Sequence, residues 1–208
     1  MSTLTYSPEK TRNDLLNAAF EEIWRSGFRA ASLDAILGKA GVTKGALYHH
    51  FRNKKELGYA VVEEVVRQKV RKQWIDPLWE ADNPIDALLS IRKNIPEEEW
   101  KDICRYGCHL NNLAQEMSPI DEGFRRRLNE IFQEWAKGIA DALRRGQEYG
   151  SVRDNINPNH AATFMIAVCE GAVSMAKNAQ AQDVLDPCWQ GLTYYLEALR
   201  PRRSFRSE

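Results

Sequence analysis

Apolar residues recur at helical spacing along most of this 208-residue chain, and this periodicity constrains the fold more than any other feature. Alternating runs of β-branched and aromatic residues, which predict strands, are missing. Proline and glycine fall between the periodic segments. With 43% hydrophobic residues, the chain can also bury a sizeable core. We therefore expect an all-α fold.

Four helices are expected in the first third of the chain. The first spans Pro8 to Ser26, and two short helices follow at 33–39 and 44–50. A longer helix is expected from Lys54 to about Trp74. The residues expected to cap or end these helices are Gly27, Ser32, Gly41, Thr43, Asn53 and Pro77.

The last two expected helices differ in composition from the others. Turn signals divide the chain beyond Pro77 into helices, of which the last two lie at 159–179 and 184–199. The helix at 159–179 is rich in small and apolar residues nearly all round its circumference, so it needs partners on more than one side. We therefore expect a homodimer whose interface includes the following residues: Gly171, Ala172, Met175, Leu192, Tyr195 and Leu196.

The net charge of zero conceals an uneven distribution. The chain carries 29 basic and 29 acidic residues, but residues 1–55 contain nine basic and five acidic ones. A basic first quarter joined to an acidic remainder suggests that one end of the protein meets a polyanion.

The helices at 33–39 and 44–50 have the pattern of a helix-turn-helix, because the turn Ala40-Gly41-Val42-Thr43 joins them. The second helix places Lys44 and small residues at its N-terminus, where side chains and amides approach bases and phosphates. A glycine inside a helix costs about 1 kcal/mol relative to alanine, so close approach to DNA explains Gly45 best. The residues expected to bind DNA are Ser32, Thr43, Lys44, Gly45, Ala46, Tyr48, His49, Lys54 and Lys55.

The segment from Thr11 to Val61 resembles the DNA-binding domain of the TetR family of one-component bacterial repressors. The stretch GFRAASLDAILGKAGVTKGALYHHFRNKKEL at 27–57 carries the resemblance. It implies an obligate homodimer with two DNA-binding heads, a divergent helical ligand-binding domain and dimerisation through the final two helices. The expected domains are a helix-turn-helix domain at 1–55, with a signature that extends to about residue 70, and an effector-binding and dimerisation domain at 56–208.

The second domain is expected to hold a mainly apolar pocket for a small organic effector. Cys104 and Cys108 are four residues apart, which predicts that they share one helix face. The candidate pocket residues are Trp100, Cys104, Cys108, His109, Met165 and Cys169. The first interpretation of Cys104 and Cys108 is that they are small buried hydrophobic residues, and the alternative is a thiol in the pocket that reacts with the ligand or an oxidant.

No enzyme, cofactor or metal site is expected, because the sequence lacks nucleophile elbows, phosphate loops and metal-ligand motifs. Asp121, Glu122 and Glu130, with Arg125–Arg127, look like a charged helix surface with paired side chains. No apolar stretch is long enough to span a membrane, and the expected location is the cytoplasm.

The sequence as a whole predicts a transcriptional regulator, most simply a repressor. A dimer would bind a palindromic operator in double-stranded DNA and be released by the effector, whose identity the sequence does not give. The alternatives are a DNA-binding regulator without an effector and one that responds through cysteine oxidation or modification.

Overall fold

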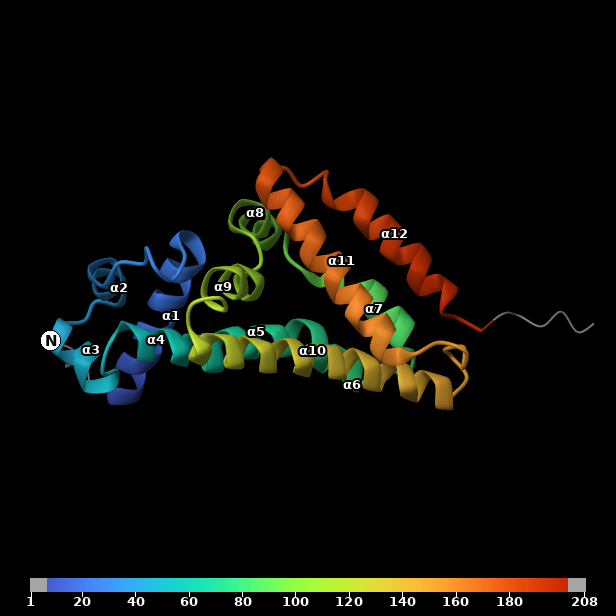
Figure 1. Ribbon diagram of the computed structural model, residues 1–208, viewed down its shortest axis with the longest axis horizontal. Helices are drawn as coiled ribbons and strands as arrows, with labels where there is room; N and C mark the ends of the chain where they lie inside the picture. Colours follow the sequence, from blue (N-terminus) through green and yellow to red (C-terminus); the bar gives the residue numbers. More distant parts are fainter. Residues whose placement is uncertain (1–6, 202–208) are drawn as a thin grey trace, which may run out of the picture. The chain divides into compact units, whose positions relative to one another are not determined.

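The computed structural model describes residues 7–201, which form helices and no strands (Figure 1). The helices and their bounds are α1 (Pro8–Ser26), α2 (Leu33–Ala40), α3 (Lys44–His50), α4 (Lys54–Ala60), α5 (Arg67–Val70), α6 (Asp76–Trp79), α7 (Pro84–Ile91), α8 (Glu97–Tyr106), α9 (His109–Met117), α10 (Glu122–Glu148), α11 (Pro158–Ala179) and α12 (Leu185–Ala198). The all-α expectation is confirmed.

The chain contacts divide into two compact units. The first runs to Lys69 and also includes His109–Glu130, so it contains α1 to α4, α9 and the first third of α10. In this unit α1 packs against α2, α3 and α4. Its core includes fully buried leucines such as Leu15, Leu47 and Leu110. Two segments that are far apart in the sequence thus share one core.

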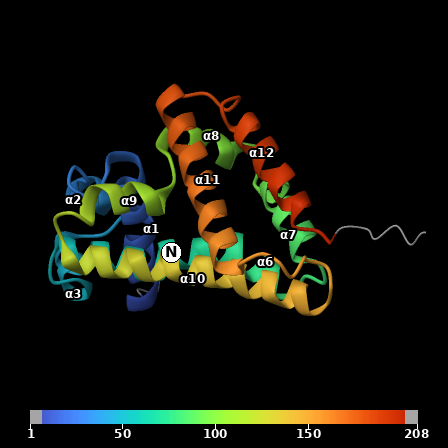
Figure 2. The ribbon, with the colours of Figure 1, turned by 45° about the vertical axis from the view of Figure 1, so that its right-hand side comes forward.

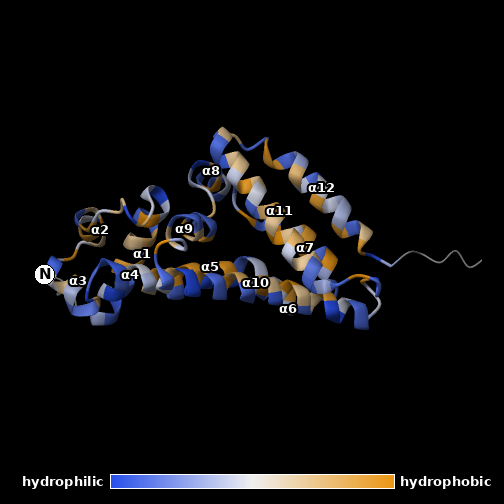
Figure 3. Cartoon of the chain, viewed as in Figure 1, coloured by the Kyte–Doolittle hydropathy of each residue, from blue (hydrophilic) through white to orange (hydrophobic). Residues whose placement is uncertain are grey.

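The second unit contains Val70–Cys108 and the chain from Ile131 onward. In it α11 packs against both α8 and α12, and α12 packs against α7. Figures 1 and 2 both show α11 and α12 side by side. Apolar colour follows much of α11 in Figure 3, in agreement with the composition of that segment. Both units contribute to α10, because the boundary between them falls inside this helix.

Helical backbone continues from Lys54 to Trp79, so the expectation that Pro77 ends this helix is wrong. Two π-helical segments interrupt the α-helical bonding, at Val61–Val66 and Arg71–Ile75. The Asp76 N–H donates to the Arg71 carbonyl and completes the second π turn. Pro77 then lies at the start of α6, where its missing N–H costs no helical bond.

Cys104 and Cys108 do not share a helix, which corrects the expectation drawn from their spacing. The helix α8 ends at Tyr106, and Gly107 follows with a φ of 84°. A residue with this φ cannot continue a right-handed helix, so Cys108 lies outside α8. The next helix, α9, begins at His109.

Candidate nucleic-acid interface

Three side-chain caps fix the helix-turn-helix and the helix that follows it. Ser32 Oγ accepts a hydrogen bond from Ala35 N–H at 3.3 Å, and Thr43 Oγ1 accepts one from Ala46 N–H at 3.2 Å. Asn53 caps α4 in the same way. Each cap satisfies a backbone donor that has no partner within its helix. All three predicted N-caps are confirmed.

The turn between α2 and α3 also has the predicted geometry. Gly41 adopts a left-handed conformation with a φ of 65° and ψ of 31°, which glycine reaches without steric cost. The Val42 N–H then donates to the Leu37 carbonyl and closes the end of α2. The turn therefore starts α3 in a defined direction.

The helix α3 has one buried and one exposed side. Leu47 is fully buried against the core, while Lys44, Gly45, Tyr48 and His49 are exposed. Tyr48 is 47% exposed, which is high for a large aromatic residue inside a helix. Of the nine residues predicted to bind DNA, Ala46 and Lys54 are half-buried and the others are exposed.

Gly45 has no steric partner within the chain. A Cβ added there would meet only Thr43 Oγ1, at an ordinary contact distance of 3.8 Å. By contrast, a Cβ added at Gly58 would lie 2.8 Å from the Phe124 ring, and one at Gly123 would overlap the Tyr59 side chain. Internal packing therefore accounts for Gly58 and Gly123 and leaves Gly45 unexplained.

The two lysines at the start of α4 have different surroundings. Lys54 Nζ donates to the Arg29 carbonyl at 3.0 Å and lies 5.1 Å from the centre of the Phe28 ring. Lys55 Nζ lies 3.6 Å from Asp121 Oδ2, and its side chain is about half exposed. The Lys54 amine is thus tied to the fold, while that of Lys55 has solvent access.

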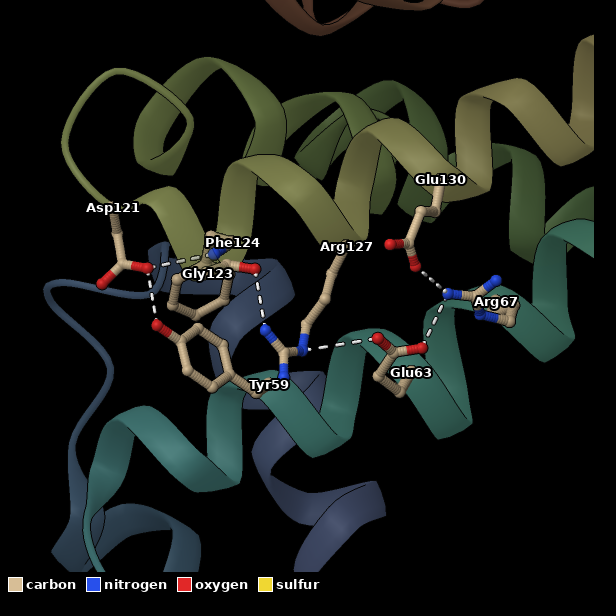
Figure 4. A network of polar contacts seen from close by, with 8 residues as sticks. All are labelled: Tyr59, Glu63, Arg67, Asp121, Gly123, Phe124, Arg127 and Glu130. Atoms are coloured by element: carbon tan, nitrogen blue, oxygen red, sulfur yellow. Dashed lines mark hydrogen bonds and ion pairs between the residues drawn. The ribbon is translucent and has the colours of Figure 1, made fainter.

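A polar network joins α4 to the start of α10 (Figure 4). Tyr59 donates its hydroxyl hydrogen to Asp121 Oδ1 at 2.6 Å, and the same oxygen accepts the Phe124 N–H at 3.0 Å. Burial and this hydrogen bond raise the pKa of Tyr59 to about 12. The hydrogen bond from Tyr59 is the main reason why the pKa of Asp121 is lowered. Asp121 is therefore a charged N-cap of α10 that also anchors α4.

Arginine side chains extend this network along α10. The Arg127 guanidinium lies 4.2 Å from the centre of the Tyr59 ring and donates to the Gly123 carbonyl at 3.0 Å. Arg67 Nη2 lies 2.7 Å from Glu63 and 3.3 Å from Glu130 (Figure 4). The interpretation of this region as only a charged surface was therefore wrong for Asp121 and Arg127. Tyr59 and Glu63, with which they interact, lie more than 60 residues away in sequence, and no local pattern indicates these contacts.

The six predicted pocket residues are divided between the two units. His109 belongs to the first unit, where its ring packs 5.4 Å from that of Phe20. Burial lowers the pKa of His109 to about 3. The other five belong to the second unit, where Trp100 makes an edge contact with Trp189. Met165 and Cys169 are buried on α11, as is Cys104 on α8.

A partly satisfied carboxyl group lies beside the predicted cysteines. A hydrogen bond links Glu170, on α11, to the Cys108 thiol. The other oxygen, Oε2, is buried without a hydrogen-bond partner among the described residues. Burial raises the pKa of Glu170 to about 7 and that of the Cys169 thiol to about 12. Burial also raises the pKa of Cys104.

A groove of about 360 Å³ also lies in the second unit, between α7 and α12. Its lining includes Leu88, Trp189 and Leu196, and none of the six predicted pocket residues. Arg92, another lining residue, pairs with Asp186 at 2.5 Å across it.

The residues predicted to form the dimer interface differ in their exposure. Ala172, Leu192 and Leu196 are buried by the packing of the chain itself, while Gly171 and Met175 are exposed. Tyr195 is half-buried, and its ring lies 4.6 Å from that of Phe164.

The described residues contain no cluster of side chains suited to a metal ion. No helix within 7–201 is long and apolar enough to cross a membrane.

Two family models match the chain, one near its start and one over its later part. The model described as "Bacterial regulatory proteins, tetR family" matches residues 15–61. The model described as "Tetracyclin repressor-like, C-terminal domain" matches residues 85–192. The first match includes α2, the turn and α3.

Relatives and solved structures agree with these models. The chain is 27% identical to the HTH-type transcriptional repressor DhaR of Mycobacterium sp. (strain GP1), over 91% of this chain and 92% of that protein. It is 30% identical to the HTH-type transcriptional regulator UidR of Escherichia coli (strain K12), over 88% and 89%. The crystal structure of a regulatory protein TetR from Rhodobacter sphaeroides matches with a TM-score of 0.78 at 26% identity, over 88% and 97%. These matches show that the chain belongs to the TetR family of transcriptional regulators.

Proposed function

We propose that this regulator is a ligand-responsive repressor that acts in the cytoplasm and binds a palindromic operator as a homodimer. The exposed face of α3, with Lys44, Gly45 and Tyr48, is the observation that carries the proposal. Each of the two copies would place α3 in a major groove, as helix-turn-helix dimers do. A small organic effector would release the operator, because it binds more tightly to a state in which the two heads no longer fit the DNA.

Within each head the contacts divide by chemistry. Lys44, Gly45, Ala46, Tyr48 and His49 would face the bases and nearby phosphates, since they form the outer side of α3. The hydroxyls of Ser32 and Thr43 cap the two helices and would lie beside the backbone. Of the two lysines on α4, we propose Lys55 as the main phosphate contact, since the Lys54 amine is bonded to Arg29.

The dimer interface would use the exposed side of α11 and α12. Gly171 on α11 and Gly191 on α12 are exposed, and nothing within 4 Å would obstruct a Cβ at either position. The close approach of a second helix would account for both of these mid-helix glycines. Phe164 and Met175 also lie on α11. They are 46% and 57% exposed and supply apolar surface.

The effector would bind in the second unit, near the predicted residues Trp100, Cys104, Cys108, Met165 and Cys169. Glu170 supports this place, because an effector with a hydrogen-bond donor would satisfy its unpartnered oxygen. The raised pKa of Cys104 and of Cys169 keeps both thiols protonated and argues against a response through their oxidation.

The test is to select binding sites from a random-sequence pool of duplex DNA with the purified protein. The proposal predicts enrichment of one palindromic sequence, bound by two chains per duplex in a gel-shift assay. Lys44→Ala should reduce affinity for the enriched duplex, while Lys137→Ala, an exposed lysine on α10, should leave it unchanged. A pool that shows no enrichment would refute the proposal. A metabolite panel screened for release of the duplex then tests the ligand response.

A further inference from the structure

A carboxylate from a distant part of the chain holds the turn that leads from α1 into α2. Glu116, on α9, accepts the Phe28 N–H through Oε2 at 2.7 Å and the Arg29 N–H through Oε1 at 2.8 Å. These amides follow Gly27, whose φ of 81° turns the chain away from α1. One carboxylate thus binds two successive backbone donors with short, charge-assisted hydrogen bonds.

The same turn has contacts on its other side. Lys54 Nζ donates to the Arg29 carbonyl at 3.0 Å, and the Phe28 ring lies 4.6 Å from that of Phe124. Ser32 closes the turn, since its N–H donates to Glu22 Oε1 at 3.0 Å and its hydroxyl caps α2. The position of the turn therefore sets where α2 begins.

The Glu116 carboxylate projects from a well-anchored helix. Leu110, Leu113 and Met117 bury one side of α9. Just beyond α9, Asp121 accepts the hydroxyl hydrogen of Tyr59 and so links this segment to α4 (Figure 4). The carboxylate thus has a defined place relative to the helices of the head.

We propose that Glu116 is a positioning residue for sequence-specific DNA binding, through which α9 sets the orientation of α2 and α3. The inference rests on the proposed function, in which α3 reads the DNA. Hydrogen bonds to base edges require donor–acceptor distances of about 2.7–3.2 Å, so a small rotation of α3 breaks them. Flexible lysines follow the phosphates through such a rotation. Loss of the Glu116 contact should therefore weaken sequence-specific binding and spare general DNA binding.

The variant Glu116→Gln tests this, because its amide group can accept from only one of the two backbone donors. The matched control is Glu122→Gln, which removes the same charge from an exposed site on α10. The probes are a duplex selected by the wild-type protein from a random pool and a duplex of shuffled sequence. Glu116→Gln should bind the selected duplex at least fivefold more weakly and the shuffled duplex within twofold of wild type. Glu122→Gln should bind both duplexes within twofold.

A loss below fivefold on the selected duplex, or an equal loss on both duplexes, overturns the inference. A wild-type protein that selects no duplex refutes the proposed function, and the inference with it. Hydrogen exchange on the wild-type protein provides a test that does not depend on how the variant folds. The Phe28 and Arg29 amides should exchange more slowly with the selected duplex bound than with the shuffled one. Equal exchange rates in the two complexes overturn the inference.

Discussion

Replacing Glu170 with glutamine should change how the stability of the protein depends on pH. Glu170 lies on α11, where burial raises its pKa from the ordinary value of 4.5 to about 7. Its Oε2 has no hydrogen-bond partner among the described residues. Ionisation of the carboxyl group is therefore unfavourable in the folded state, and glutamine removes this ionisation while it keeps the shape of the side chain.

The sign and the size follow from the two pKa values. Between pH 4.5 and 7 the folded protein keeps the proton on Glu170, whereas the unfolded chain releases it. The contribution of Glu170 to the free energy of unfolding is thus highest below pH 4.5, falls as the pH rises to about 7 and then levels off. A tenfold change in a protonation equilibrium corresponds to about 1.4 kcal/mol, so this one group lowers the stability by about 2–3 kcal/mol between pH 5 and pH 8.

The assay is urea unfolding of wild type and Glu170→Gln at pH 5 and pH 8, at one protein concentration. Relative to wild type, the variant should gain about 2–3 kcal/mol of unfolding free energy between pH 5 and pH 8. Glu99→Gln, an exposed carboxylate on α8, is the control and should show no comparable gain. A difference between Glu170→Gln and wild type that stays the same at both pH values would show that the Glu170 carboxyl group is not held in its protonated form.

Three further predictions concern DNA binding, packing and assembly. Lys55→Ala should weaken binding to all duplexes alike and reduce the salt-dependence slope by about 1.8, the value for one phosphate contact in each of the two copies, whereas an unchanged slope excludes that contact. Gly58→Ala should lower the free energy of unfolding by about 1–3 kcal/mol, because the added Cβ would lie 2.8 Å from an aromatic ring. Gly38 has open space around it, so Gly38→Ala should raise that free energy by up to about 1 kcal/mol. Equal changes for the two variants in urea unfolding would contradict the close packing around Gly58. Gly171→Arg should give a folded monomer by light scattering, and a variant that stays dimeric would place the interface elsewhere.

Local features of the fold could be predicted because their causes lie within a few residues. Ser32, Thr43 and Asn53 each accept from the backbone N–H three residues later, and this spacing is visible in the sequence. Gly41 could be placed at the turn, because few other residues adopt its conformation readily. The helix-turn-helix was therefore predictable almost to the residue.

Contacts between distant segments could not be predicted from one sequence. Glu116 binds amides 88 and 87 residues away, and Asp121 binds a tyrosine 62 residues away. The spacing of Cys104 and Cys108 suggested a shared helix face, but the conformation of Gly107 separates them. The π turn before Pro77 accommodates the proline, but the sequence around it does not predict this turn. Pro77 was therefore expected to end the helix. Tertiary packing decides each of these cases.

Crosslinking from α3 tests the central claim most directly. A photoreactive p-benzoylphenylalanine in place of Tyr48 should crosslink to the duplex that the wild-type protein selects, since Tyr48 lies on the exposed face of α3. The same substitution at Tyr194, which is 67% exposed on α12, should give no crosslink and controls for random contact. Equal crosslinking from both positions, or none from position 48 in a protein that still binds the duplex, would contradict the assignment of α3 as the helix that reads the DNA.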